Sequence, residues 1–264
     1  TLVVGNGARG LRLGKRFGFS EVSTTGDTVW TNRKINTVIL AGKHGDHGKQ
    51  VIQGLAHGKN IFVEKPLALT CQELDDIEVA FANASSSEAS PLLMVDFNRR
   101  FSPLVRRTKD LLKDVHGPKT VIYTVNAGKV EDSHWIHDPN VGGGRIKGEV
   151  CHFIDLVRFI VGAEIVDRQI SGMSRLASNS IESDAVSIFF RFADGSVATI
   201  HYLTNGGRRY PKEKIEIFCA GRTLSLDNFR SLTGFNWPGF KRTRLWRQNK
   251  GNHESLRAFV AAMK

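Results

Sequence analysis

The sequence predicts two domains of different classes, a parallel α/β domain followed by an α+β domain with a mainly antiparallel sheet. In the first hundred residues, short runs rich in Val, Ile and Leu alternate with helical stretches, which is typical of βαβ units. Beyond them, β-type runs flank turns such as Asp-Gly, which indicates antiparallel hairpins. We therefore expect a first domain over residues 1–100 and a second, with a large open-faced sheet, over residues 101–264.

Four buried-looking runs are expected to form the parallel strands: "TLVV", "TVILAG", "NIFVEKP" and "LLMVDFN". Helical stretches lie between them at 47–57 and 72–84, and "ANASSSEAS" (82–90) is interpreted as a polar loop. Ligands bind at the carboxyl ends of such strands. The residues expected at that edge are Lys43-His44, Glu64-Lys65-Pro66 and Asn98-Arg99-Arg100.

The second half contains three expected hairpins, which turn at Asp194-Gly195, Ala220-Gly221 and Pro238-Gly239. The run "TVIYTVNAG" alternates and adds a further strand. One helix is expected from about Lys147 to Val161, and another from His253 onward.

Composition excludes several classes of protein. The three cysteines are far apart and lack Cys-x-x-Cys spacing, which argues against a disulfide framework and favours a cytoplasmic protein. No apolar run is long enough to span a bilayer, so we expect no membrane association. The net charge of +11 comes from scattered Lys and Arg without an aromatic-rich RNA-binding motif, so we expect no nucleic-acid partner.

Three stretches resemble the glucose-fructose oxidoreductase / inositol dehydrogenase / MocA (Gfo/Idh/MocA) family: "HGKNIFVEKPLALT", "MVDFNRRFSPLVRRTKDLLK" and "HWIHDPNVGGGRIKGEVCHFIDLVRFIVG". The resemblance implies a Rossmann-type first domain and an oxidoreductase that uses NAD or NADP. It also implies hydride transfer between nicotinamide and a sugar, nucleotide-sugar or cyclitol, and a homo-oligomer, dimer or tetramer, formed through the sheet. The basic charge fits an anionic substrate.

By this similarity, Lys65 lies between cofactor and substrate, and His152 is the general acid/base. An ammonium can protonate or hydrogen-bond a reacting oxygen, and an imidazole titrates near neutral pH. Most relatives place an aspartate one helical turn before this histidine, where this chain has Gly148. We expect Glu149 to substitute in part, by orienting the imidazole or a substrate hydroxyl. The alternative is a mere surface contact.

Other binding residues are carried over from the same resemblance. The stretch "AGKHGDH" stands where many relatives have Thr-Pro-Asn and a later His. The expected cofactor-binding residues are Gly5, Gly7, Arg9, Gly42, His44, His47, Glu64, Lys65 and Pro66. The expected substrate-binding residues are Asn98, Arg100, Trp135, Gly143 and Gly144. A metal site at His44, Asp46 and His47 lacks further ligands, so no metal is expected.

The opening "TLVVGNGARGLRLGKRFGF" has the G-x-G-x-x-G spacing of a dinucleotide fingerprint. However, "FSEVS" is a poor strand, and the motif Glu64-Lys65-Pro66 follows too soon by about one βα unit of ~30 residues. We interpret 1–4 as the second strand and the glycines as a cofactor-facing loop, with the first βα unit preceding Thr1, as in modules of longer proteins with a zinc-alcohol-dehydrogenase-like partner. The absence of an acid near Arg9 slightly favours NADP. A non-catalytic sugar- or partner-binding module is the alternative function.

Overall fold

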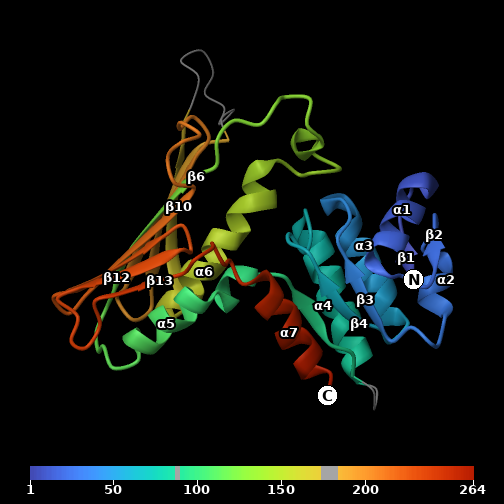
Figure 1. Ribbon diagram of the computed structural model, residues 1–264, viewed down its shortest axis with the longest axis horizontal. Coiled ribbons are helices and arrows are strands. Elements are labelled where there is room, and N and C mark those ends of the chain that lie inside the picture. The colour runs from blue at the N-terminus through green and yellow to red at the C-terminus, as the bar shows by residue number, and fades with distance from the viewer. Residues whose placement is uncertain (87–89, 174–183) are drawn as a thin grey trace.

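The computed structural model describes residues 1–86, 90–173 and 184–264 (Figure 1). Two halves follow one another along the chain. The parallel half contains β1 to β5, and the large-sheet half contains β6 to β13. The predicted class, a Rossmann-like parallel sheet followed by a large, mainly antiparallel sheet, is confirmed.

The main sheet of the parallel half has three strands, β3 (Thr37–Leu40), β4 (Asn60–Val63) and β5 (Leu93–Val95), all parallel. The helices α3 (His44–Ala56) and α4 (Cys71–Ser85) connect them. Thr70 and Glu73 form a capping box that starts α4. Because α4 continues to Ser85, the first residues of the expected polar loop are helical instead.

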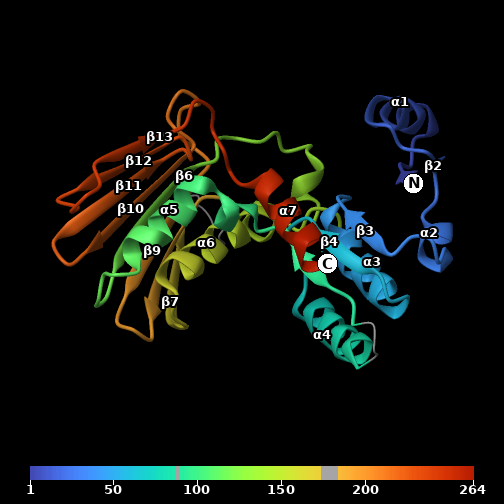
Figure 2. The same cartoon turned by 60° about the horizontal axis from the view of Figure 1, so that its bottom comes forward.

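The opening stretch forms a separate two-stranded parallel sheet. Its elements are β1 (Leu2–Val3), α1 (Gly7–Phe17) and β2 (Val22–Ser23), followed by α2 (Asp27–Thr31). Among the described residues this sheet has no hydrogen-bonded neighbour in β3–β5, and Figure 2 shows the two apart. Two expectations are corrected here: "FSEVS" does contribute a strand, and Gly7 and Gly10 lie in a helix rather than in a loop. Gly10 is needed because its β-carbon position lies 3.0 Å from the Val22 side chain.

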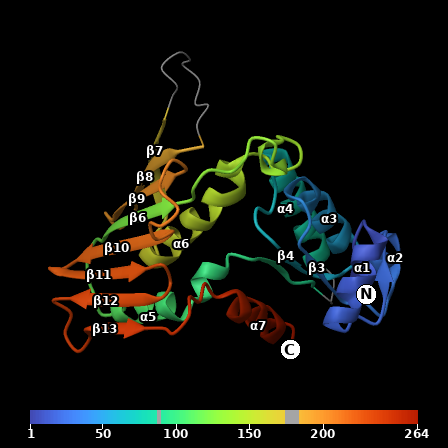
Figure 3. The same ribbon diagram turned by 45° about the horizontal axis from the view of Figure 1, so that its top comes forward.

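The large sheet has the order β13-β12-β11-β10-β6-β9-β8-β7 (Figure 3). All neighbours are antiparallel except β6 and β9, which are parallel. The three expected hairpin turns are confirmed, between β8 and β9, β10 and β11, and β12 and β13. The strands are β6 (Thr120–Asn126), β7 (Ile165–Gly172), β8 (Val186–Phe192), β9 (Val197–Leu203), β10 (Glu213–Cys219), β11 (Arg222–Asp227), β12 (Ser231–Phe235) and β13 (Arg242–Arg244).

Two helices, α5 (Pro103–Leu112) and α6 (Cys151–Val161), pack on one face of this sheet and form the main core with it (Figure 3). The inward positions of the strands alternate with exposed ones, as the sequence pattern predicts. A π-helical turn, Ile146–Val150, leads directly into α6, so the expected helix is present but begins with a wider turn.

The helix α7 (Asn252–Ala262) follows the large sheet in sequence but packs against the parallel half (Figure 1). The Phe259 ring lies 5.4 Å from that of Phe62 in β4, and Ser255 Oγ donates to Asp96 Oδ1 at 2.5 Å. The short 3₁₀ helix η1 (Asn98–Phe101) also contacts α7. Within the described residues, no helix is long and apolar enough to cross a membrane.

Candidate active site

The two halves meet at Gly148. Lys65 follows β4, at the carboxyl end of the parallel sheet, and its Nζ donates to the Gly148 carbonyl at 2.7 Å. Gly148 belongs to the π-helical turn, and His152 lies four residues further on, in the first turn of α6. Both predicted catalytic side chains are therefore brought to the same helical segment from opposite halves.

His152 is nearly buried, with 8% of its surface exposed, and the Phe97 ring packs against its edge at 6.1 Å. Its Nδ1 is buried without a hydrogen-bond partner among the described residues. Burial, reinforced by the charges of Arg99 and Lys65, holds the pKa of His152 well below its usual value. The imidazole is therefore neutral at pH 7 and can accept a proton.

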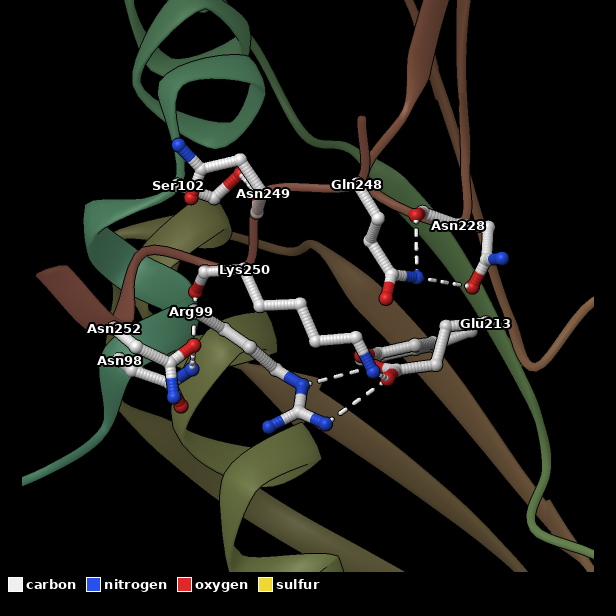
Figure 4. A network of polar contacts seen from close by, with 10 residues as sticks. Asn98, Arg99, Ser102, Glu213, Asn228, Gln248, Asn249, Lys250 and Asn252 are labelled. Carbon is white, nitrogen blue, oxygen red and sulfur yellow. Dashed lines mark hydrogen bonds and ion pairs between the residues drawn. The ribbon is translucent and has the colours of Figure 1, made fainter. Parts of the chain in front are cut away.

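A buried charge network lies beside this histidine (Figure 4). The carboxylate of Glu213, at the start of β10, accepts from Arg99 Nε and Nη2 at 2.9 Å each and from Tyr123 OH at 2.5 Å. Lys250 Nζ donates to the same carboxylate at 2.6 Å. Burial alone would raise the pKa of Glu213, but Arg99 and Lys250 outweigh it and hold the value at about 2.

The carboxylate of Glu149 bonds two residues of the large-sheet half. Its Oε2 accepts from Tyr202 OH at 2.8 Å, and its Oε1 lies 3.5 Å from Arg145 Nε. Among the described residues no hydrogen bond joins it to the imidazole, and Glu149 belongs to the π-helical turn rather than to α6. Its expected role in orienting the imidazole or a substrate hydroxyl stays a prediction.

His44 links the two halves by a hydrogen bond, and His47 holds the segment after β4 in the same way. Nδ1 of His44 donates to the Gly142 carbonyl at 2.9 Å, and Nδ1 of His47 donates to the Pro66 carbonyl at 2.8 Å. Trp135 lies edge-on to His44, with ring centroids 4.9 Å apart. Burial lowers the pKa of His44, although the bond to Gly142 opposes this shift.

The triglycine segment packs against the parallel half. Gly143 and Gly144 have φ of +72° and +83°, and a β-carbon on Gly143 would lie 2.4 Å from Leu69 Cδ2. Glycine is therefore required at residue 143 both for the backbone conformation and for the approach of Leu69.

Two predicted substrate-binding residues are engaged elsewhere. Asn98 Nδ2 donates to the Lys250 carbonyl at 3.1 Å and to Asn252 Oδ1 at 2.9 Å (Figure 4). Arg100 pairs with Asp155, and its Nε lies 2.6 Å from Asp155 Oδ2. Arg99 lies between them and was expected at the same strand-end edge, although no binding role was given to it; its charge acts on His152.

Glu213 and Lys250 were not predicted from the sequence. Neither belongs to a recognisable motif, and they approach Arg99 only through the path of the large sheet. The one available signal is the position of Glu213 in β10, where it continues the inward-facing series of buried residues.

Two of the residues expected to bind the cofactor are glycines with open space beside them at strand ends. Gly42, after β3, has no atom within 4 Å of its β-carbon position, and the same holds for Gly5 after β1. Nε2 of His47 is buried without a hydrogen-bond partner in the described parts of the chain. These features fit a polar ligand that lies across the strand ends. Within residues 1–86, 90–173 and 184–264, no three His, Cys, Asp or Glu side chains group as a metal site requires.

Comparison with known proteins agrees with this architecture. A model described as "Oxidoreductase family, NAD-binding Rossmann fold" matches residues 2–87, and one described as "GFO/IDH/MocA C-terminal domain" matches residues 118–225. The first match describes an NAD-binding Rossmann fold and the second a C-terminal domain of the same family, so the two matched domains correspond to the two halves of the structure. The chain belongs to the Gfo/Idh/MocA family.

Individual relatives are distant. A 2,7-anhydro-N-acetylneuraminate hydratase of Mediterraneibacter gnavus is 25% identical over 78% of this chain and 58% of its own length. The scyllo-inositol 2-dehydrogenase (NAD(+)) of Bacillus subtilis is 28% identical over 65% of this chain and 48% of its own length. A solved levoglucosan dehydrogenase in complex with NADH and levoglucosan shares the fold, with a TM-score of 0.82 and 20% identity over 99% of this chain and 79% of its own. The chain thus spans about half to three fifths of these curated relatives.

Proposed function

We propose that this chain contains the catalytic site of an NAD(P)-dependent dehydrogenase that interconverts a hydroxyl and a ketone on a sugar or cyclitol. The proposal rests on one observation. Lys65, from one half, donates a hydrogen bond to the helical segment of the other half, and this segment contains the neutral, buried His152. Named relatives that oxidise scyllo-inositol or levoglucosan support this choice of substrate class.

The residues divide the proton chemistry between them. The neutral imidazole of His152 accepts the proton of the reacting hydroxyl, and Lys65 donates a hydrogen bond to the same oxygen as its negative charge develops. A bound NAD or NADP would supply the acceptor for the hydride of the carbon that carries this oxygen. In the reverse direction His152 returns the proton to the ketone oxygen.

The cofactor-binding surface proposed here includes Gly5, Gly7 and Arg9, with Gly42, His44, His47, Glu64 and Pro66 beside Lys65. Its open glycines and the unpartnered Nε2 of His47 support this assignment. Arg9 is exposed, which suits a 2′-phosphate and hence NADP. A titration of the chain with NADH and NADPH, repeated on Arg9→Ala, tests this: a weaker affinity for NADPH alone is expected.

The unpaired edges of β1 and β3 support a further proposal. Among the described residues neither strand has a partner on that side, and Val3 and Ile39 are 40% and 57% exposed. One additional apolar βα unit between them would unite the two small sheets, as in a module of a longer protein. Cofactor affinity would then rise when that unit is supplied.

The open face of the large sheet supports a homo-oligomer. Apolar side chains such as Ile170, Phe218 and Phe235 lie 58%, 40% and 56% exposed on strands of this sheet. A dimer or tetramer would bury them. Light scattering on the purified chain tests the oligomeric state.

The central experiment measures NAD⁺ and NADP⁺ reduction with a panel of cyclitols and sugars for the wild type, Lys65→Ala and His152→Ala. A loss of about 100-fold or more in turnover is expected for each variant. Lys147→Ala is the matched control, because Lys147 also bonds a carbonyl across the halves, that of Leu69 at 3.0 Å. Sugar binding without any nicotinamide binding, even in a chain extended at its N-terminus, would indicate the alternative, a non-catalytic module.

A further inference from the structure

Positive charge is in excess around His152. Four cations act on its imidazole, Arg99, Lys65, Lys250 and Lys212. Arg99 and Lys250 share the single carboxylate of Glu213, which also accepts from Tyr123 and is fully buried. Within the described residues Lys65 and Lys212 form no ion pair. The one shared carboxylate cannot balance these charges.

The other carboxylates near this helix are engaged with partners of their own. Glu149 lies beside Arg145 and accepts from Tyr202, and Asp155 pairs with Arg100. The negative charge of Glu64 lies near Asp96. Burial is the main cause of the raised pKa of Asp96, and the charge of Glu64 adds to it. Asp96 also acts on Arg99 and offsets part of the positive charge, whereas Lys65 and Lys212 have no ion-pair partner of their own among the described residues.

Two of the cations lie where a ligand could reach them. Lys250 keeps 21% of its side chain exposed, and Lys212, directly before Glu213, is exposed. The backbone of Lys212 is fixed, because Asn126 N donates to its carbonyl at 2.8 Å. The loop before it, "GGRRYPK", contains no acid. The partly exposed Lys250 and the exposed Lys212, which directly precedes the partner Glu213 in the chain, are thus two members of this group of cations that solvent reaches.

We propose that the substrate carries an anionic group, a carboxylate or a phosphate, which binds to Lys250 and Lys212 while a ring hydroxyl faces His152. This inference rests on the proposed function for the role of the hydroxyl, whereas the anion site itself depends only on the charges. Burial lowers the pKa of Lys250, and repulsion from Arg99 and Lys212 adds to this effect. A bound anion would relieve that repulsion and replace water with charge-assisted hydrogen bonds.

The test uses three probes with one ring: D-glucose, D-glucuronate and D-glucose 6-phosphate. Each is titrated into the full chain while the imidazole signals are followed by NMR, with His152→Gln used to assign the His152 signal. We expect one or both anions to shift that signal with an affinity about tenfold or more above that of glucose. The stronger anion distinguishes a carboxylate site from a phosphate site.

Variants decide whether the two lysines are responsible. Lys212→Met and Lys250→Met are each expected to weaken anion binding about tenfold. Lys214→Met is the matched control, because Lys214 is on the same strand segment but pairs with Glu216 at 2.9 Å. Because Lys212 is exposed, its variant remains informative if Lys250→Met fails to fold. Glucose binding as tightly as the anions, no response to either anion, or unchanged affinity in Lys212→Met overturns the proposal.

A parallel titration with NADH separates this inference from the proposed function. Anion binding without any nicotinamide binding, even in a chain extended at its N-terminus, would leave the anion site in place and refute the dehydrogenase. Nicotinamide binding and turnover of neutral sugars, without anion binding, would refute the anion site alone.

Discussion

A β-carbon on Gly148 would lie 2.8 Å from Cε1 of His44, so His44 occupies the space that a side chain at residue 148 would need. His44 is itself fixed by its bond to the Gly142 carbonyl and by the edge of Trp135. This chain therefore combines a glycine from one half with a histidine from the other. The two residues form a single packing unit across the interface.

The first prediction tests this unit. Gly148→Ala is expected to lower the free energy of unfolding by about 1–3 kcal/mol, because the new methyl group clashes with the His44 ring, which its own contacts hold in place. His44→Ala creates the missing room, so the double variant should be more stable than the sum of the single effects predicts. Urea denaturation of the four proteins measures the coupling. Strict additivity would show that the two residues are not packed as described.

The second prediction concerns the buried network. Glu213→Gln is expected to cost about 3–5 kcal/mol of stability, because Arg99 and Lys250 would remain buried without a carboxylate. Glu216→Gln, on the same strand, removes a half-exposed pair with Lys214 and should cost less than about 1 kcal/mol. Equal effects of the two substitutions in urea denaturation would contradict this description of Glu213.

The third prediction follows from the lowered pKa of His152. As pH falls through about 6.5, this histidine is protonated in the unfolded chain but stays neutral in the folded chain. The free energy of unfolding therefore falls. His152→Gln removes this contribution and should reduce the loss by up to about 1.4 kcal/mol per pH unit below 6.5. Denaturation curves at pH 7.5 and 5.5 measure it, with exposed His57→Gln as the control. A variant that loses stability as steeply as the wild type would indicate a protonated imidazole.

The fourth prediction concerns a carboxyl group with a raised pKa, for which the pH dependence of stability has the opposite sign. Burial raises the pKa of Asp96 from 3.8 to about 6, although its bond from Ser255 opposes this shift. Between these values the folded chain holds the extra proton, so stability falls as pH rises across that window. Asp96→Asn keeps an acceptor for Ser255 and should be more stable than wild type at pH 7.5 by about 3 kcal/mol, and by less at pH 5. A constant difference across pH would contradict a raised pKa.

Local patterns were sufficient for most of the fold. The runs that became β3, β4 and β5 are short and rich in β-branched residues, and the Asp194-Gly195 turn identifies its hairpin at once. The sites of Lys65 and His152 followed from motif positions. The roles given to these two residues stay predictions until activity is measured.

Contacts between distant segments could not be predicted in this way. Arg99, Glu213 and Lys250 meet because the η1 segment, the start of β10 and the chain before α7 converge. The conformation around Glu149 was missed for a different reason: a π-helical turn depends on packing across the whole segment, and no sequence signal marks it. Periodicity describes one element at a time, whereas these features depend on several elements together.

The packing of Phe259 on Phe62 also has a consequence for biosynthesis. A ribosome releases the parallel half long before it has made α7, so the nascent chain presents Phe62 to solvent while the entire large sheet is being translated. The parallel half therefore cannot bury Phe62 fully before α7 has been synthesised. Until residue 259 has emerged, this apolar surface stays exposed, which favours aggregation of the nascent chain over correct packing.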